Sequence, residues 1–507
     1  MADDSDPLMP DGQAASSSYG TDAAAASAVA AKSDKEDSPV EHPWWRWNFI
    51  ATLASEFGRG YVAIVIAVYG LAQGADAELT GFATTYLFAD TLKVTPSRQN
   101  ELMGLAQIPW TIKPLFGLLS DTLPIFGYHR YPYIALSALA GIGSCLGLYL
   151  QTSWGTITAM SATVFLLLGS FSTAIPDVII DATVTERVKT HPHLAADLQA
   201  LCWGSNAALS IVASAAVGPL QEHMGAPTVF LISTLVSGMV FVPSVIGWLP
   251  EQKSVDKGGI GALCKKTCCA PPVLSGDEDL VKEAKGRRAI FTLALINCVF
   301  AVGIGTLVVT VPMFVGEEEV DHVTAVVGVT AGITFGVVLW AYLREVSTVM
   351  AAFVFYTYMS GAMVPSARIM FYWYHDTPEN QARGNPCLSA SFLGMMGSFG
   401  QAFLLLGTVL YTKYFKHWSY QSIFFMTQCI GLVLGCTDLL WVNRLNVQAG
   451  ISDQAFVFSS ASVQWCQCSA TARGHSQPLC AVRSVGLLRL ALRPGHTESE
   501  EGCAQVE

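Results

Sequence analysis

Charged residues are scarce in this chain: they make up 13% of its 507 residues, whereas hydrophobic residues make up 52%. Soluble globular domains carry about 25% charged residues, so the composition excludes an ordinary soluble domain. Much of the formal net charge of -11 lies in the two tails and in an acidic loop at 317–319. Nothing in this pattern supports binding to nucleic acid, and the low charge predicts a chain that lies in a lipid bilayer.

Catalytic and targeting signatures are missing as well. The thirteen cysteines do not form a secreted disulfide framework, and they do not have the spacing of a metal site. The sequence has no phosphate-binding P-loop, no Gly-x-Ser-x-Gly nucleophile elbow and no His-Glu-x-x-His motif. We therefore expect no enzyme activity, no cofactor and no metal. No charged segment followed by an apolar run occurs at the start, which predicts that there is no signal peptide.

Long apolar runs dominate what is present. About 20 apolar residues cross the hydrocarbon core of a bilayer, and backbone groups there must pair within the segment, so each run is predicted to be a helix. The fold class is therefore all-α, a polytopic transmembrane helical bundle. The sequence contains eleven such segments: 62–88, 99–119, 133–152, 156–179, 198–218, 227–249, 289–315, 323–343, 349–372, 389–411 and 418–442.

Basic residues between these segments predict the orientation of the chain. Fourteen lie in one set of loops, eight of them in 250–288, and three lie in the other set. Basic loops stay on the cytoplasmic side, so the N-terminus is predicted to be cytoplasmic. Trp44, Trp45 and Trp47 are predicted to lie at the membrane interface before the first span. Which membrane holds the protein does not follow from these patterns.

A weak internal repeat indicates two related halves. Val68 begins a Val-Tyr-Gly-Leu-Ala-Gln-Gly run and Phe355 begins a Phe-Tyr-Thr-Tyr-Met-Ser-Gly run, and in each case a polar loop and another span follow. Duplicated halves are common in secondary transporters. The predicted parts are a disordered cytoplasmic tail at 1–61, a first six-helix half at 62–249, a cytoplasmic linker at 250–288, an extra helical hairpin at 289–343, a partial second half at 344–458 and a polar, disordered or aberrant tail at 459–507. The alternative is an eleven-span protein with a natural tail.

Six charged residues fall within the predicted spans: Asp76, Glu78, Lys113, Asp177, Asp181 and Arg368. A charge at mid-bilayer costs about 2.5–3.5 kcal/mol on insertion scales, so such residues normally have a partner or a function. Asp177 and Asp181 are four residues apart and share a helix face. They either bind a proton or the substrate, or pair with Lys113 or a nearby basic residue. We predict that these six residues bind substrate or couple its movement to an ion.

The positions of these charges allow more than one interpretation. Asp76 and Glu78 point to different faces of their helix, so at most one needs to face an aqueous path. Lys113 lies close enough to the end of its span to reach the interface instead. Gln199, Trp203, Ser205 and Asn206 either line a cavity or stabilise helix contacts.

The loop after the second span carries a further pattern, formed by Gly117, Asp121, Gly127 and Arg130. It resembles a diverged form of the major-facilitator loop signature. Gly117 permits close helix packing, Asp121 would lie near a neighbouring helix N-terminus, and Arg130 would anchor at the headgroups. We predict that this loop gates the carrier and does not bind its substrate.

Longer stretches resemble one particular family. The segment Glu101–Asp121, with Ile-Pro-Trp-Thr-Ile-Lys-Pro-Leu-Phe-Gly, and the following Gly127–Arg130 are similar to the signature of the folate–biopterin transporter family. Asp177–Glu186 resembles the fourth-span motif of that family and Leu198–Trp203 its fifth-span motif. A late motif is matched by Leu445-Asn446 with Gly450-Ile-Ser-Asp453. The chain is thus identified as a member of this family, which belongs to the major facilitator superfamily.

The resemblance implies a secondary active transporter for folates or pterins. In the family's pattern, the matching positions here are Lys113, Asp121, Arg130, Asp177 and Asp181. A folate or pterin is then the expected small-molecule partner, and proton coupling is a hypothesis. The hairpin at 289–343 departs from short plant-type members, and the last spans of the second half are missing. Two alternatives are a carrier of another organic anion or solute and a truncated membrane protein that does not transport.

Overall fold

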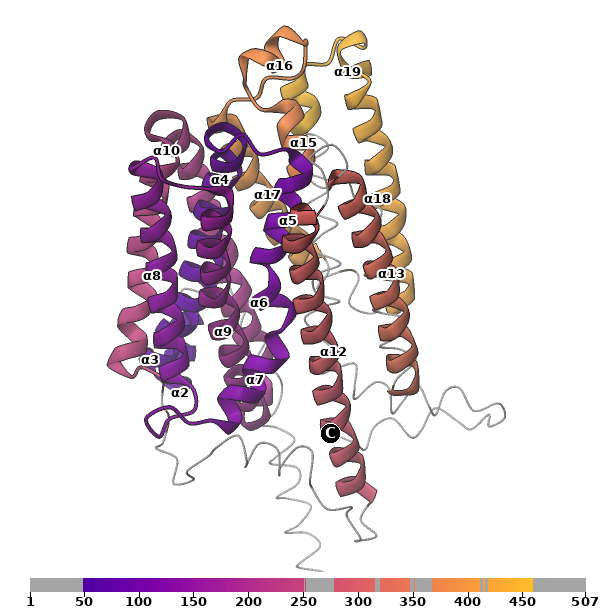
Figure 1. The fold of residues 1–507 in the computed structure, drawn as a ribbon. Coiled ribbons are helices and arrows are strands. Elements are labelled where there is room, and N and C mark those ends of the chain that lie inside the picture. The colour runs from indigo at the N-terminus through magenta and orange to yellow at the C-terminus, as the bar shows by residue number, and fades with distance from the viewer. Residues whose placement is uncertain are drawn as a thin grey trace, which may run out of the picture. The chain divides into compact units, whose positions relative to one another are not determined.

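The computed structural model describes residues 49–249, 251, 278–314, 320–346, 351, 367–410, 414 and 418–458 (Figure 1). This part of the chain is nearly all helical and contains two isolated bridges but no strand. The predicted all-α class is therefore correct. The predicted belt of Trp44, Trp45 and Trp47 and the tail at 459–507 lie outside the described residues.

The first span, Arg59–Thr91, is continuous but changes its winding, and a short helix precedes it beyond a break at Gly58. The short helix is α2 (Phe49–Phe57), and the elements of the span are α3 (Arg59–Val65), η1 (Ile66–Asp76), α4 (Ala77–Tyr86) and η2 (Leu87–Thr91). Both η1 and η2 are π-helical. A π-helix has more residues per turn than an α-helix, which rotates side chains away from their α-helical faces, and such stretches often occur at functional sites. An α-helical period therefore does not describe the side-chain directions along all of η1.

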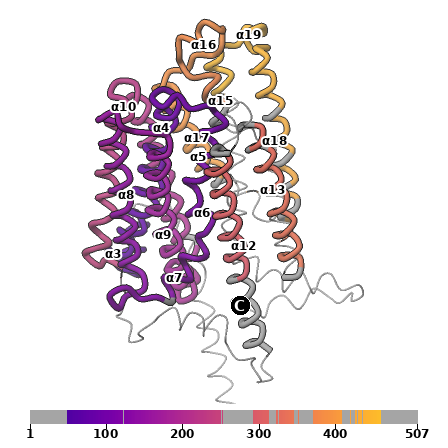
Figure 2. The backbone as a smooth tube through the Cα atoms, in the orientation of Figure 1, coloured from indigo at the N-terminus to yellow at the C-terminus, as the bar shows by residue number. Residues whose placement is uncertain are grey.

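The predicted second span, 99–119, is divided into three short helices: α5 (Pro96–Ala106), α6 (Ile108–Thr111) and α7 (Lys113–Thr122). Figure 2 shows the chain passing through them in turn. The helices are separated at Gln107 and Ile112, whose backbones are not helical. Pro109 and Pro114 begin the two later helices, because proline lacks the N–H that a continuing helix needs. The second interruption places Lys113 at the first turn of α7.

Three longer helices complete the first half: α8 (Tyr131–Ser153), α9 (Ala159–Thr190) and α10 (Ala195–Ile246), with the 3₁₀ turn η3 (Pro192–Leu194) before α10. A helix of the 52 residues of α10 would be about 78 Å long, far more than one bilayer crossing. It is interrupted at Gly225, where φ is +77° and ψ is 170°. The predicted spans 198–218 and 227–249 lie on the two sides of this break.

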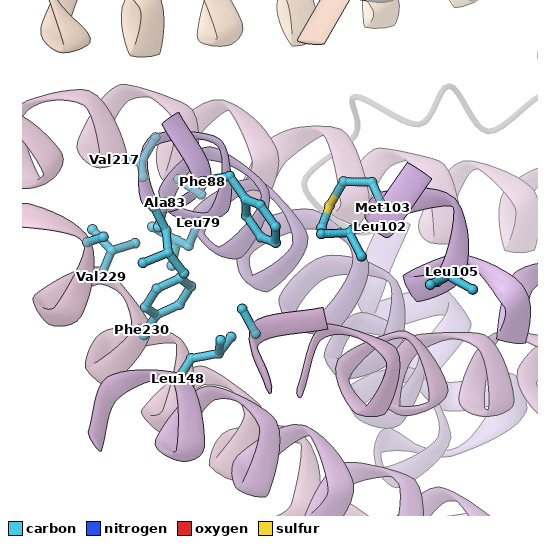
Figure 3. Close-up of a cluster of buried hydrophobic side chains, with 14 residues drawn as sticks. Leu79, Ala83, Phe88, Leu102, Met103, Leu105, Leu148, Val217, Val229 and Phe230 are labelled. Carbon is cyan, nitrogen blue, oxygen red and sulfur yellow. The ribbon is translucent and has the colours of Figure 1, made fainter. Parts of the chain in front are cut away.

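Leucine, valine and phenylalanine side chains from several helices form the core of this half (Figure 3). Leu79 and Phe88 come from the first span and pack with Leu102, Leu148 and Phe230. Four of these five side chains are at most 1% exposed, and Leu79 is 4% exposed. This core fixes η1 and α4 against α10, and the polar side chains of the first span are thereby held at defined positions.

Two helices follow the linker region: α12 (Glu278–Phe314) and α13 (Val320–Val346). They contact each other, and α12 also lies along α5, α6 and α7 (Figure 1). Gly305 allows this approach, because an added Cβ would lie 3.0 Å from Ile108 Cδ1. Arg98 Nη1 donates to the Val308 carbonyl at 3.2 Å. Large apolar side chains of this pair are exposed, among them Val299, Val302, Val329 and Ile333, as expected of a surface facing lipid.

The remaining described helices are α15 (Ala367–Tyr374), α16 (Pro378–Ala382), α17 (Ala390–Leu410), α18 (Tyr420–Val442) and α19 (Leu445–Gln448). Helix α17 crosses α10 at a point where both have glycine. An added Cβ would lie 2.5 Å from the Ala390 carbonyl oxygen at Gly218 and 2.7 Å from the Ser214 carbonyl oxygen at Gly394. Only glycine permits backbones to meet this closely, as in small-residue contacts between membrane helices.

Seven of the described helices are long and apolar enough to cross a membrane. They include segments of α12 and α13, Thr292–Val311 and Val326–Arg344; the predicted hairpin at 289–343 stays a prediction. The predicted segment 418–442 coincides with α18. Most of 349–372 lies outside the described residues. The part of the chain that the structure describes is therefore a polytopic helical bundle, as predicted.

Candidate functional site

An ion pair joins α7 to α9 in the first half. Lys113 Nζ contacts Asp177 Oδ2, and the two side chains are 23% and 9% exposed. A cation at the start of a helix is unfavourable for the helix dipole, so the Asp177 carboxylate offsets both that effect and the burial of Lys113. The prediction that Asp177 pairs with Lys113 is the alternative that the geometry favours. Lys113 does not extend alone to the interface.

The two aspartates of α9 both receive hydrogen bonds from η1. Gln73 Nε2 donates to Asp177 Oδ1 at 2.6 Å, and the Tyr69 hydroxyl donates to Asp181 Oδ1. Tyr69 and Gln73 are four residues apart, which matches the four-residue spacing of the two aspartates. Two parallel contacts therefore hold η1 on the polar face of α9, and the charge of Lys113 is shared within one connected network.

Aromatic rings border this network. Lys113 Nζ lies 3.6 Å from the centroid of the Trp110 ring, close enough for a cation–π interaction. The Trp203 ring meets the Tyr69 ring edge-on, with centroids 6.2 Å apart. Asn206 Nδ2 donates to the Tyr69 carbonyl at 3.2 Å, which attaches α10 to the π-helical stretch. We call the set Tyr69, Gln73, Trp110, Lys113, Asp177, Asp181 and Trp203 the Lys113 cluster.

The Lys113 cluster is buried on one side and accessible on the other. Asp177 is 7% exposed as a residue and Tyr69 is 3% exposed. Trp203 is 39% exposed, and Asp181 is also exposed. A solute that reached Asp181 and Trp203 would therefore meet an aromatic ring and a carboxylate first, and the ion pair behind them.

Asp76 and Glu78 belong to different environments, as their two-residue spacing predicted. The Asp76 carboxyl accepts a hydrogen bond from Ser237 Oγ at 3.0 Å. The Glu78 carboxyl accepts from Ser214 Oγ at 3.2 Å and from Gln401 Nε2 at 2.7 Å. The structure does not bring either acid into the Lys113 cluster. Glu78 instead connects the first half to α17.

Further contacts join the same two regions near α16. His375 Nε2 lies 2.9 Å from Asp90 Oδ1, and the Tyr372 hydroxyl donates to the Val94 carbonyl at 2.8 Å. The backbone N–H of Ser391 donates to Glu222 Oε2 at 2.9 Å. We call these three contacts, together with the Gly218–Gly394 crossing and the Glu78–Gln401 bond, the α16-end contact. It holds α15 and α17 against the first span and α10.

The predicted gating loop has its glycines and its arginine in defined roles. An added Cβ at Gly117 would lie 3.1 Å from Val178 Cγ1, so this glycine permits α7 to pack on α9. Gly127 has a φ of +85°, which favours glycine. Arg130 binds Glu186 through both guanidinium ends, with Nη1 2.7 Å from Oε2. The Glu186 hydrogen bond is the main cause of a raised pKa at Arg130.

A carboxylate that sequence reasoning did not single out caps the start of α8. Glu251 accepts hydrogen bonds from the backbone N–H groups of His129 at 2.5 Å, Arg130 at 3.1 Å and Tyr131 at 3.2 Å. The charges of Asp121 and Glu251 are further causes of the raised pKa of Arg130, after Glu186. No sequence pattern pointed to Glu251, because it follows a proline far along the chain.

Arg368 is the second residue of α15, and its side chain lies outside the described residues. Sequence reasoning also missed Tyr69, Gln73 and Trp110. Trp110 stands three residues before Lys113 in the same motif, and this spacing was the available signal. Among the described residues no group of three or more His, Cys, Asp or Glu side chains could hold a metal ion.

The described helices have the fold of an integral, multi-pass membrane protein. A solved POT family transporter in complex with 5-aminolevulinic acid matches the fold with a TM-score of 0.52 and 12% identity, over 82% of this chain and 83% of that one. This likeness concerns the fold alone.

Sequence comparison defines the family. A model of the BT1 family matches residues 73–468, and the chain belongs to this family. It is 28% identical over 414 residues to the probable folate-biopterin transporter 5 of Arabidopsis thaliana, covering 81% of this chain and 67% of that protein. It is 34% identical over 212 residues to the folate-biopterin transporter of Synechocystis, covering 41% of this chain and 39% of that protein. The predicted family is thus confirmed, and the relatives are transporters, not enzymes.

Proposed function

We propose that this protein is a secondary active transporter that carries folates or pterins across a membrane and binds them at the Lys113 cluster. The relatives named as folate-biopterin transporters support the substrate class. The main evidence for the location of the binding site is the Lys113–Asp177 ion pair, which lies in the first half beside exposed Asp181 and Trp203. Charged groups at membrane depth are functional by default.

The chemistry of a pterin matches that of the cluster. The ring has an edge of N–H and NH₂ donors that a carboxylate such as Asp181 accepts, and a flat face that stacks on an indole such as Trp203. A folate also carries glutamate carboxylates, which a lysine ammonium binds as a point charge. Binding at Lys113 would compete with Asp177 for the same ammonium, so substrate entry would loosen the link between α7 and α9.

The two networks outside the cluster serve the alternation of access. The α16-end contact closes one side by joining α15 and α17 to the first half. The Gly117–Arg130 loop acts at the other end as a gate, with Arg130 and Glu186 as its ion pair. With the N-terminus cytoplasmic, as the basic loops predict, the α16 end faces away from the cytoplasm.

The direct experiment is uptake of radiolabelled folate and of a labelled pterin into proteoliposomes that contain the purified protein. Lys113→Ala should reduce folate uptake at least tenfold, because the ammonium that binds the glutamate tail is lost. Pterin uptake should fall less, since a pterin without that tail does not use the ammonium. Lys189→Ala is the matched control, because Lys189 is an exposed lysine near the end of α9 and lies outside the cluster.

Two results would contradict this assignment. Wild-type vesicles that take up neither compound would exclude folates and pterins as substrates, and competition by a panel of organic anions would then identify another class. Equal folate uptake by wild type and Lys113→Ala would leave the transporter intact but move its site elsewhere. Proton coupling is part of the proposal: uptake that does not change between about pH 5.5 and about pH 8 would exclude it.

A further inference from the structure

A buried carboxyl at the end of η1 has no cation beside it. Asp76 is 7% exposed, which equals the exposure of Asp177. None of the ion pairs among the described residues includes Asp76. An ionised carboxylate that is buried without a partner costs far more than one that is paired, so such a group normally takes up a proton.

The groups that face Asp76 are hydroxyls and one thiol. Ser237 of α10 donates to Asp76 Oδ2 at 3.0 Å. Ser233, one turn earlier on α10, lies beside the same carboxyl, and Cys145 of α8 is the titratable group near it. Helix α9 contributes a hydroxyl farther out: an added Cβ at Gly141 would lie 2.2 Å from Ser172 Oγ and 3.3 Å from Ser237 Oγ.

Two atoms at this place have no hydrogen-bond partner. They are Asp76 Oδ1 and Ser233 Oγ, both fully shielded from solvent. Ser233 is 0% exposed and Ser237 is 3% exposed. Asp76 Oδ1 is therefore shielded from water, and the groups around its carboxyl are hydroxyls rather than a cation. A proton on Oδ1 would remove the charge of the buried carboxyl, and the resulting O–H is a donor that the Ser233 hydroxyl can accept.

A metal cation fits this place less well. Hard cations such as Ca²⁺ and Mg²⁺ take about six or more oxygen ligands, whereas the described side chains supply one carboxyl and two hydroxyls. A proton needs one oxygen and one acceptor. We propose that Asp76 Oδ1 binds and releases the coupling proton of the transport cycle, with the Ser233 hydroxyl as the acceptor of the protonated form. This inference rests on the proposed transport function and assigns a separate atom to the coupling step.

The step balances without any other reactant. The proton comes from water on the side to which the first half is open, forms the Oδ1–H bond, and returns to water on the opposite side. No bond of the carried substrate forms or breaks. Asp76 directly precedes α4, which holds Glu78 in the α16-end contact, so a change at Asp76 is transmitted along one helix to that contact.

The test separates driven accumulation from exchange. For counterflow, proteoliposomes are loaded with unlabelled folate and kept at equal pH on both sides. For accumulation, they are placed in a medium more acidic than their interior, so that protons are driven inward. In Asp76→Asn, accumulation of folate should fall at least tenfold, whereas the counterflow rate should stay within about twofold of the wild-type rate. Ser233→Ala should move the half-maximal pH of uptake downward, because the protonated form loses its acceptor. Ser244→Ala is the matched control: it is a buried serine of α10 bonded to its own helix at Val240 O.

The outcomes distinguish the two proposals. Wild-type counterflow without any response to the pH gradient would overturn the inference and leave the transport function standing. If wild type shows neither counterflow nor a response to the pH gradient, both the transport function and the inference are wrong. Gradient-driven accumulation by Asp76→Asn, or loss of its counterflow in a folded protein, would also overturn the inference. As a readout without transport, the infrared carbonyl band of a buried protonated carboxyl should be present in wild type and absent in Asp76→Asn.

Discussion

Two aspartates of the first half are equally buried and differ in their partners. Asp177 and Asp76 are each 7% exposed. Asp177 contacts Lys113 and Gln73, whereas Asp76 accepts a hydrogen bond from Ser237 on one oxygen and has no hydrogen-bond partner on the other. Burial alone therefore does not define the role of an acid in this protein. A paired acid can exchange its cation with a substrate, and an acid among hydroxyls can exchange a proton.

The largest difference between the two aspartates is expected when each is neutralised in turn. Asp177→Asn leaves the Lys113 ammonium half-buried without its counter-charge and should cost about 3 kcal/mol of stability. Asp76→Asn should change stability by less than about 1 kcal/mol, because an amide replaces a protonated acid of the same shape. Thermal unfolding of the two purified variants measures the difference. Equal losses would mean that both acids are ionised and that the comparison is wrong.

The second prediction separates folding from function at the Lys113 cluster. The double variant Lys113→Met, Asp177→Leu replaces a buried pair by apolar side chains of similar size, which is often neutral or stabilising. Its unfolding midpoint should recover by about 2 kcal/mol relative to Asp177→Asn, while folate uptake stays at least tenfold below wild type. Recovered uptake in the stable double variant would show that the pair is only structural.

The third prediction concerns the α16-end contact, where backbones meet closely at Gly218 and Gly394. Gly394→Val places side-chain atoms against the Ser214 carbonyl and the Gly218 backbone, and should cost about 1–3 kcal/mol through overpacking. Gly238→Ala is the control, because an added Cβ there meets nothing within 4 Å. Crosslinking between cysteines introduced at Ser214 and Ser398 should decrease in Gly394→Val only. Unchanged crosslinking would mean that this crossing does not hold the two regions together.

The smallest effect is expected at a third aspartate, outside the spans. Asp453 Oδ1 accepts hydrogen bonds from Trp441 at 2.9 Å, Arg444 at 2.6 Å and Asn446 at 2.9 Å. Burial raises the pKa of Asp453, but these donors outweigh burial, and the net pKa is lower than usual. Its stabilisation is therefore present above the unfolded-state value of about 4 and is lost as the pH falls through the lower folded-state value.

Asp453→Asn should reduce stability at neutral pH by less than about 1 kcal/mol, because the site is partly exposed. The difference between wild type and variant should vanish in acid. Thermal unfolding of both proteins over a pH series checks this sign. A difference that grows toward acid would contradict the bonding at Asp453.

Hydropathy was sufficient to predict the class and many of the helices. It separated 198–218 from 227–249 although one long helix with a break at Gly225 contains both. It could not show the division of 99–119 into three helices, even though Pro109 and Pro114 were visible in the sequence. A proline indicates where a helix is weakened, but tertiary packing decides whether the helix bends or ends there.

The candidate site could be predicted in part. The four-residue spacing of Asp177 and Asp181, and the charge of Lys113 at membrane depth, identified three members of the cluster. Tyr69 and Gln73 were missed because η1 is π-helical, which no periodic pattern reveals. The assignment of Asp76 and Glu78 to different surroundings followed from spacing alone. Their partners on α10 and α17 could be found only in three dimensions.

Direct binding tests the central claim, that the Lys113 cluster holds the substrate. Isothermal titration of folate, and of a pterin without the glutamate tail, into the purified protein gives both affinities for wild type and for the stable double variant Lys113→Met, Asp177→Leu. Folate affinity should fall at least tenfold in the variant, and pterin affinity should fall less. Equal folate affinity in the two proteins would contradict the claim.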